Sequence, residues 1–404
     1  MNLKVSALVC ALGLLAACGA KEEATTPATD SRTTSEQFDA AVQKMTTAFF
    51  YHVPEAATQL GISEDIVPGT AHRLMDRSVD GNKDRNNSLE AALAQLNSAD
   101  TETLSPERQR THAVLTTLIE GALGPSRVVD FGTTAGAWTL WFLPYSIVQN
   151  SGPTVDIPNF LNSHQPVTSA DEAEAYLVRL ASVDEALDGA FESYRHGVQQ
   201  GAIPPDFIVE KSLAVVEGFI EPPADQNTLY VSFVDKLEKA GIENAQAYAD
   251  RALKIIDAEV VPAYQRIADY MGEIRASAPH EAGIWRLPDG EALYAAMIRH
   301  MTDSDVSAED IHQIGLDEVE RITQEMDGIL RSEGYTEGTV GERMQKLNVE
   351  PRFLYANDAE GKETLLNDVR AQVEGMYAEL PNWFRKLPKH KVEVRMVPEF
   401  SQES

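Results

Sequence analysis

Apolar residues recur at helical spacing along most of the chain. One early run carries its apolar side chains at intervals of three or four residues: Phe38, Val42, Met45 and Phe49. This spacing places them on one face of a helix at about residues 35–50. Thr34 and Gln37 stand at the start of the run with the spacing of a capping box, so we expect the first helix to begin there.

The same signals predict helices through the rest of the chain. Capping residues precede amphipathic runs at Asn87 with Glu90, Ser105 before Pro106, Ser169 with Glu172, Ser307 with Asp310, and Thr339 with Glu342. Residues 245–276 predict a long helix that Pro262 should kink or split. Residues 308–332 predict another that stops at Gly334.

Strand patterns are rare. Residues 127–131 form a short β-prone run, and residues 391–397 alternate apolar and polar side chains before Pro398. No unit of about 30–50 residues recurs, so a solenoid is not supported. The expected fold class is therefore mainly α, a multi-helix array with a few short strands.

The composition and the net charge limit the kinds of molecule that the protein can bind. The chain has 404 residues, of which 43% are hydrophobic, and a formal net charge of −29. It can therefore form a packed core, but it repels phosphates, which excludes nucleic acid and an amphipathic helix lying on anionic lipid. Two interpretations of the charge stay open: attraction of cationic peptides, or an acidic surface that keeps the protein soluble.

The N-terminus predicts export and lipidation. Residues 1–17 combine Lys4 with an apolar run too short to span a bilayer, which is typical of a signal peptide. The end of this run, Leu15-Ala16-Ala17-Cys18, resembles the lipobox of bacterial lipoproteins, so we expect cleavage after Ala17 and acylation of Cys18. The alternative is an ordinary secretory signal in which Cys18 is incidental.

The segment after the signal predicts a tether. Residues 18–35 are polar and lack apolar periodicity, so they should link the lipid flexibly to a helical domain at 36–404. Gly19 is not the Asp that favours inner-membrane retention of lipoproteins, so we expect an outer-membrane lipoprotein of the bacterial cell envelope that faces the periplasm. It should touch the membrane through its lipid alone. Cys10 and Cys18 are the only cysteines, so the mature domain can form no internal disulfide.

The His280-Glu281 pair raises the question of a zinc-peptidase site. A helical HExxH motif needs its second His four residues after the first, because only that spacing brings both imidazoles to one face. Ile284 occupies that position. Gly283 and Pro279 also disfavour an unbroken helix, so the pair should lie in a loop and bind no zinc.

Other candidate motifs also fail on spacing. None of the nine histidines lies three or four residues from another. Residues 80–86 resemble the opening of a calcium loop but lack its later Gly and Glu, so we expect a solvated loop that leads into a helix at Asn87. The chain also lacks the motifs of serine hydrolases, P-loops and dinucleotide-binding folds.

Residues 283–322 form a more specific pattern. They combine a loop with Trp285, a Pro-Asp-Gly turn, a helix with Tyr294 and a capped helix that contains His312. This arrangement resembles the bacterial family DUF885 (domain of unknown function 885), whose members are often exported lipoproteins. Further matching segments lie at 54–61, 176–180, 201–205 and 392–395, and the resemblance extends over about residues 45–397.

The resemblance implies a fold and a chemistry. The family looks like the helical gluzincin-type zinc peptidases, with two lobes around a deep cleft. In the family, a His-Glu segment and a Pro-Gly-His segment supply the zinc ligands and general base, and they follow the counterpart of residues 392–397. Because this chain stops at Ser404, we assign no catalytic residue, metal ligand or cofactor within it, and zinc is implied only for a full-length family member.

Two functional hypotheses follow from the resemblance. The first is the N-terminal scaffold portion of a lipid-anchored, zinc-metallopeptidase-like protein, catalytically inactive as given and either truncated or a fragment. The second is a non-enzymatic periplasmic lipoprotein that binds peptides or a partner protein in its cleft. Trp285, Tyr294 and His312 are candidates for lining the cleft, although we favour core packing and helix capping for them.

Overall fold

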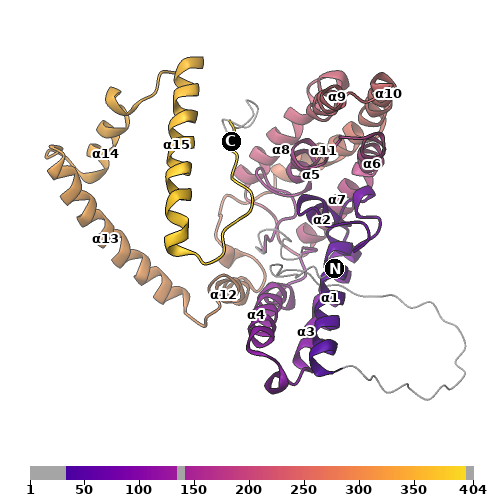
Figure 1. The fold of residues 1–404 in the computed structure, drawn as a ribbon, viewed down its shortest axis with the longest axis horizontal. Helices are drawn as coiled ribbons and strands as arrows, with labels where there is room; N and C mark the ends of the chain where they lie inside the picture. The colour runs from indigo at the N-terminus through magenta and orange to yellow at the C-terminus, as the bar shows by residue number, and fades with distance from the viewer. Residues whose placement is uncertain (1–32, 134–141, 397–404) are drawn as a thin grey trace, which may run out of the picture. The chain divides into compact units, whose positions relative to one another are not determined.

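The computed structural model describes residues 33–133 and 142–396, and these are mainly α-helical, which confirms the predicted fold class. The chain divides into two compact units, unit 1 at Met1–Ala308 and unit 2 at Glu309–Ser404. The longer helices of unit 1 are α1 (Thr34–His52), α2 (Pro54–Gln59), α3 (Val79–Asn97), α4 (Pro106–Val128), α5 (Pro153–Ser163), α6 (Ala170–Ala181), α7 (Val183–Gln199), α8 (Asp206–Ile220), α9 (Thr228–Ala240), α10 (Ala245–Ile255), α11 (Val261–Arg275) and α12 (Gly290–Thr302) (Figure 1). Among the described residues, no helix is long and apolar enough to cross a membrane.

The larger core of unit 1 lies among α5 to α11. Tyr176 on α6 and Phe233 on α9 stack with their ring centroids 4.2 Å apart. Tyr176 and Tyr264 are fully buried, and their hydroxyls donate to the carbonyl oxygens of Leu229 (3.2 Å) and Thr154 (2.8 Å). Because an unpaired hydroxyl is costly to bury, these bonds allow both aromatic rings to lie at the centre of the unit.

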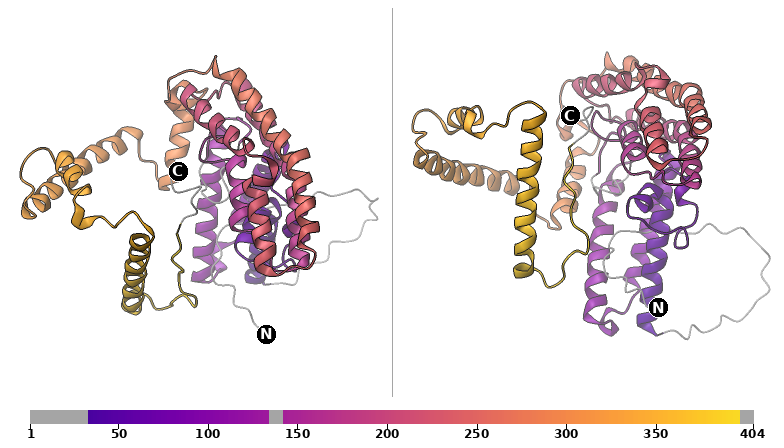
Figure 2. Two further views of the ribbon diagram at one scale, coloured as in Figure 1. Left: turned by 90° about the horizontal axis from the view of Figure 1, so that it is seen from above. Right: turned by 45° about the horizontal axis from the view of Figure 1, so that its top comes forward.

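A second core lies between α1, α3 and α4, which run side by side (Figures 1 and 2). Its buried side chains include Phe38, Met45, Leu96, Leu115, Ile119 and Leu123. Helix α12 packs on α4 at a glycine: a Cβ added to Gly121 would lie 2.5 Å from Nδ1 of His300. The small residue therefore sets the close approach of these two helices.

The long helix predicted at 245–276 forms, with an irregularity just before its proline. Helices α10 and α11 are joined by a π-helical turn at Ile256–Val260, and Pro262 follows directly in the first turn of α11. Proline lacks the N–H that would bond to the preceding turn, and the wider turn accommodates this loss. Ile256 and Val260 are fully buried, so core packing holds the turn in place.

Helix α1 has the predicted type of cap, but one residue earlier. The Thr33 hydroxyl accepts from the N–H of Glu36 (3.3 Å), and the Glu36 carboxylate accepts from the N–H of Thr33 (2.8 Å). Thr34 and Gln37, the predicted pair, lie one position further inside. The caps predicted at Ser105, Ser169 and Thr339 are confirmed at α4, α6 and α14.

The prediction for residues 80–86 was wrong. These residues form the first turns of α3, which begins at Val79 and not at Asn87. The Ser78 hydroxyl caps the helix by accepting from the N–H of Gly81 (3.0 Å). The polar sequence has weak helix propensity, but its contacts with other helices of unit 1 outweigh that preference.

Neither predicted strand forms in the described residues. Residues 127–131 instead complete α4, which runs to Val128, and then continue as an irregular segment whose apolar side chains pack into a small cluster. Within 391–397, the residues up to 396 have no regular secondary structure and pair with no described strand. Val392 donates its N–H to the hydroxyl of Tyr377 (2.7 Å). Alternating side chains are not sufficient, because a strand also needs a backbone partner.

Unit 2 consists of α13 (Ala308–Ser332), α14 (Val340–Asn348) and α15 (Ala359–Trp383). Helix α13 has the predicted bounds and stops before Gly334, which has a positive φ of 89°. Arg343 is buried and joins α14 to α13, because it bonds to the carboxylate of Asp327 and donates to the carbonyl oxygen of Tyr335 (3.1 Å).

Candidate functional site

Helix α7 carries small residues at intervals of four: Gly189, Ser193 and Gly197. A Cβ added to Gly189 would lie 2.9 Å from the backbone nitrogen of Ser78, and one added to Gly197 would lie 2.9 Å from the carbonyl oxygen of Phe131. These separations are shorter than van der Waals contact, so only glycine permits them. Because these α7 residues are small, Ser78, which caps α3, and the segment that follows α4 can both approach the backbone of α7 closely.

Asn82, in the first turns of α3, fixes this contact. It is 7% exposed, and its side-chain amide donates to the carbonyl oxygen of Gly132 (2.7 Å) and to the hydroxyl of Ser193 (3.1 Å). The Ser193 hydroxyl in turn donates to the carbonyl oxygen of Arg77 (2.8 Å). Since buried polar groups must be paired, these bonds set the register of α3 against α7.

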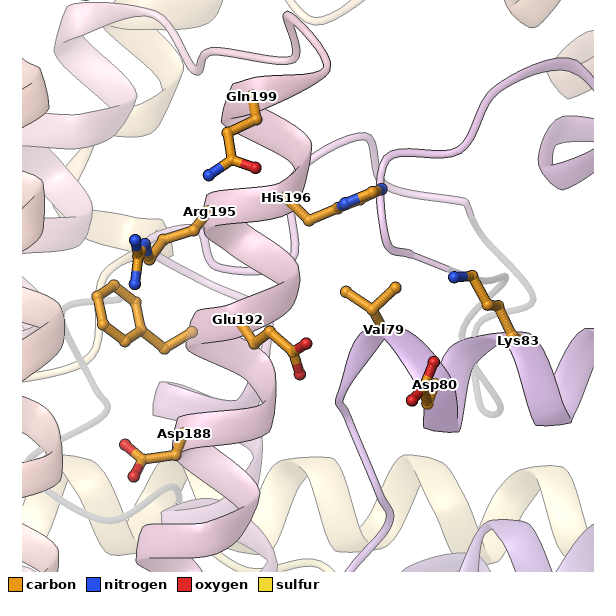
Figure 3. A pocket seen from close by; sticks show the side chains of 9 residues that line it. Val79, Asp80, Lys83, Asp188, Glu192, Arg195, His196 and Gln199 are labelled. Carbon is orange, nitrogen blue, oxygen red and sulfur yellow. The ribbon is translucent and has the colours of Figure 1, made fainter.

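A pocket of about 490 Å³, open to solvent, lies beside this contact between α3 and α7 (Figure 3). It is lined by Val79, Asp80 and Lys83 of α3 and by Asp188, Phe191, Glu192, Arg195, His196 and Gln199 of α7. The α7 residues recur at helical spacing and thus share one face of the helix. The pocket is polar and contains side chains of both charges.

Three of the lining side chains are already engaged. The Asp188 carboxylate pairs with Arg266 at 2.6 Å. The His196 Nε2 lies 3.2 Å from a backbone carbonyl oxygen in the segment after α4. The Arg195 guanidinium lies over the ring of Phe191, 5.7 Å from its centroid. These contacts hold the α7 side of the pocket in shape.

Lys83 and Glu192 are the charged lining residues that are available to contact a ligand. Neither makes a hydrogen bond or ion pair with any residue that the structure describes. Figure 3 shows both side chains directed toward the gap between the helices, Lys83 from α3 and Glu192 from α7. Asp80 lies in the first turn of α3, where the helix N-terminus favours a carboxylate. An ammonium and a carboxylate facing one open pocket can bind a ligand that carries both charges.

The residues singled out from the sequence lie elsewhere. Trp285 is 77% exposed in a short turn before α12, Tyr294 is 44% exposed on α12, and His312 is exposed on α13 in unit 2. Core packing, which was favoured for them from the sequence together with helix capping, is therefore wrong. None of the three lines the pocket between α3 and α7, and their role at a cleft stays a prediction.

His280-Glu281 lies in a loop, as predicted, where Nδ1 of His280 is 3.0 Å from the carboxylate of Asp206. Within residues 33–133 and 142–396, no three His, Cys, Asp or Glu side chains are grouped so as to hold a metal ion. The donors present in this part of the chain thus do not fit the zinc that the resemblance implies for full-length members. Ala17 and Cys18, the predicted cleavage and lipidation residues, lie outside the described residues.

Sequence comparison supplies the family. DUF885, a family described as a bacterial protein of unknown function, matches residues 54–404. The chain belongs to DUF885. The match includes both α3 and α7, so the pocket lies within the DUF885 region.

A solved structure is similar in fold to this DUF885 chain. It is a crystal structure of a "putative lipoprotein" from Colwellia psychrerythraea, with a TM-score of 0.86 and 28% sequence identity. The match covers 92% of this chain and 64% of that chain, so the present chain spans less than two thirds of the length of its relative. No curated protein matches the chain.

Proposed function

We propose that this DUF885 chain is a helical peptide-binding scaffold of a cell-envelope lipoprotein, with the pocket between α3 and α7 as the site for the charged ends of short peptides. The observation that carries the proposal is the pair of Lys83 and Glu192, which face one pocket without partners among the described residues. A free peptide offers a carboxylate for the lysine and an ammonium for the glutamate.

Two further features support peptide binding. The net charge of −29 attracts cationic peptides toward the surface. Peptide binding is also the property that the zinc-metallopeptidase-like scaffold and the non-enzymatic lipoprotein have in common. The proposal concerns binding only and attributes no hydrolytic step to the described residues.

The test is the affinity for a tripeptide of alanine with free ends, measured by isothermal titration calorimetry. We expect about tenfold weaker binding after Lys83→Gln or Glu192→Gln, because each change removes one exposed charge-assisted contact worth about 1.4 kcal/mol. The same peptide with an acetylated N-terminus and an amidated C-terminus loses both contacts and should bind about tenfold more weakly still than the free peptide binds to either variant.

Matched controls are available on other helices. Lys254 and Glu217 are exposed and lie outside the pocket, so Lys254→Gln and Glu217→Gln should leave the affinity unchanged. The proposal is wrong if the capped peptide binds as tightly as the free one, or if the control changes weaken binding as much as the pocket changes.

We also propose that the protein is anchored by lipid at Cys18 in the outer membrane and faces the periplasm. The support is the lipobox-like sequence at 15–18, the absence of Asp at position 19, and a structural relative described as a putative lipoprotein. Several acyl chains together anchor a protein almost permanently, at about 0.8 kcal/mol per buried methylene.

Substitution of Cys18 gives the matching prediction. In cells fed a labelled fatty acid, Cys18→Ala should abolish incorporation of the label and release the protein from the membrane fraction. Cys10→Ala, inside the predicted signal, should leave both the labelling and the membrane attachment unchanged. Density-gradient separation of the membranes then reports the inner or outer location. Persistent membrane attachment of Cys18→Ala would contradict the anchor, and recovery with the inner membrane would contradict the location.

A further inference from the structure

Helices α13 and α15 of unit 2 carry apolar side chains that nothing in unit 2 covers. Those with the clearest helical spacing are Ile314, Val319, Ile322 and Ile329 on α13, together with Met376 and Trp383 on α15, and each is between 44% and 78% exposed. We refer to these surfaces as the apolar faces of unit 2. On α13, Val319, Ile322 and Ile329 lie at intervals of three and seven residues and therefore share one side of the helix.

Exposure on this scale is unusual for a folded helical surface. Single exposed apolar residues are ordinary, but a row of them along two helices marks a surface that binds another polypeptide. Among the described residues of unit 2, only Leu330, Arg343 and Gly361 are buried. The three helices therefore do not form a core with one another.

The border of the α13 face indicates the charge of the partner. Helix α13 carries seven acidic and two basic residues. Both basic residues are already paired within the helix, Arg321 with Glu318 at 2.7 Å and Arg331 with Asp327 at 2.7 Å. The excess of acidic over basic residues on α13 favours a partner whose apolar face is bordered by Lys or Arg, and it disfavours a second copy of this acidic chain.

The length of the structural relative points to one occupant. More than a third of the Colwellia chain lies outside the match, while 92% of the present chain lies inside it. Since at most 8% of the present chain is unmatched, the match has to include most of unit 2. The relative thus combines the counterparts of these helices with additional polypeptide.

We propose that the apolar faces of α13 and α15 bind a polypeptide segment equivalent to the part of the Colwellia protein outside the match, through an apolar face bordered by basic side chains. This binding surface consists of residues of unit 2, and none of them lines the pocket of unit 1.

The experiment uses the full chain and, as the probe, the unmatched part of the Colwellia protein produced as a separate polypeptide. Light scattering coupled to size-exclusion chromatography gives the stoichiometry, and hydrogen–deuterium exchange reports protection of α13 and α15. We expect a one-to-one complex in which both helices become at least about tenfold more protected from exchange.

Single substitutions locate the surface. Ile322→Asp places a charge in the α13 face and should weaken the complex at least about tenfold. Gln313→Asp adds the same charge to the opposite, polar side of α13 and should have little effect. Because both positions are exposed, neither change should unfold the protein.

Four results would overturn the proposal. Protection of α13 in the isolated monomer that is as high as in the presence of the probe would show that the rest of this chain already covers the face. Protection that appears only with dimer formation would assign the face to a second copy. Failure of the probe to bind, or equal binding of the Ile322→Asp and Gln313→Asp variants, would show that this segment is not the occupant.

Discussion

Replacing Arg179 with alanine is expected to lower the free energy of unfolding by about 3–5 kcal/mol. Arg179 lies on α6 and is 0% exposed. In the described part of the chain, its guanidinium donates to oxygens and not to a carboxylate: the carbonyl oxygens of Arg73 (3.0 Å) and Thr70, and the side chains of Thr58 (2.7 Å) and Gln165. The residue therefore joins α6 to segments more than 100 positions earlier.

The large effect follows from what the substitution leaves behind. Burial lowers the pKa of Arg179 to about 10, so the side chain is still charged at neutral pH. Oxygen dipoles and the ring of Phe160, whose centroid is 4.8 Å away, stabilise that charge. Alanine would leave the buried acceptors without donors and would also create a cavity, and each of these changes is destabilising.

Urea denaturation of the protein measures this effect, and Arg251 provides the control. Arg251 on α10 is exposed and pairs with Glu174 at 2.6 Å, so Arg251→Ala should change the free energy of unfolding by less than about 1 kcal/mol. Arg179→Lys keeps the charge but loses the planar arrangement of donors. Its loss of unfolding free energy should therefore lie between those of Arg179→Ala and Arg251→Ala. A loss from Arg179→Ala no larger than that from Arg251→Ala would disprove this account of its role.

Sequence signals predicted the helices well where the signal is local. Ser105, Ser169 and Thr339 cap their own helices, and a cap is complete within a few residues, so sequence spacing is sufficient to recognise it. The start of α3 was not predicted because the contacts that stabilise it involve residues far away in the sequence. Asn82 hydrogen-bonds to Ser193, 111 positions away, and only the folded chain shows this contact.

The candidate site could not be predicted from the sequence for the same reason. Lys83 and Glu192 are two charged residues among many, and they face one pocket only because α7 receives the start of α3 at Gly189. Arg179 was visible as a residue in a segment typical of DUF885, but its burial depends on acceptors from distant parts of the chain. The family itself was predictable because its pattern extends over nearly the whole mature chain.

The double variant Gly189→Ala, Gly197→Ala is expected to lower the free energy of unfolding by about 1–4 kcal/mol. Each added methyl group would overlap backbone, the nitrogen of Ser78 or the carbonyl oxygen of Phe131, and backbone cannot rotate away as the end of a long side chain can. The higher helix propensity of alanine, about 1 kcal/mol per site, offsets only part of the cost. Since Ser78 caps α3, the variant should also displace Lys83 and weaken peptide binding.

Two other helical glycines serve as matched controls in the same denaturation experiment. A Cβ added to Gly218 on α8 or Gly272 on α11 meets nothing within 4 Å. Gly218→Ala and Gly272→Ala should therefore raise stability by about 0.5–1 kcal/mol each, because they gain helix propensity without overlap. If the double variant on α7 proved as stable as these two, the close approach of Ser78 and Phe131 to α7 would not be what positions α3. The pocket would then have to depend on the hydrogen bonds of Asn82 alone.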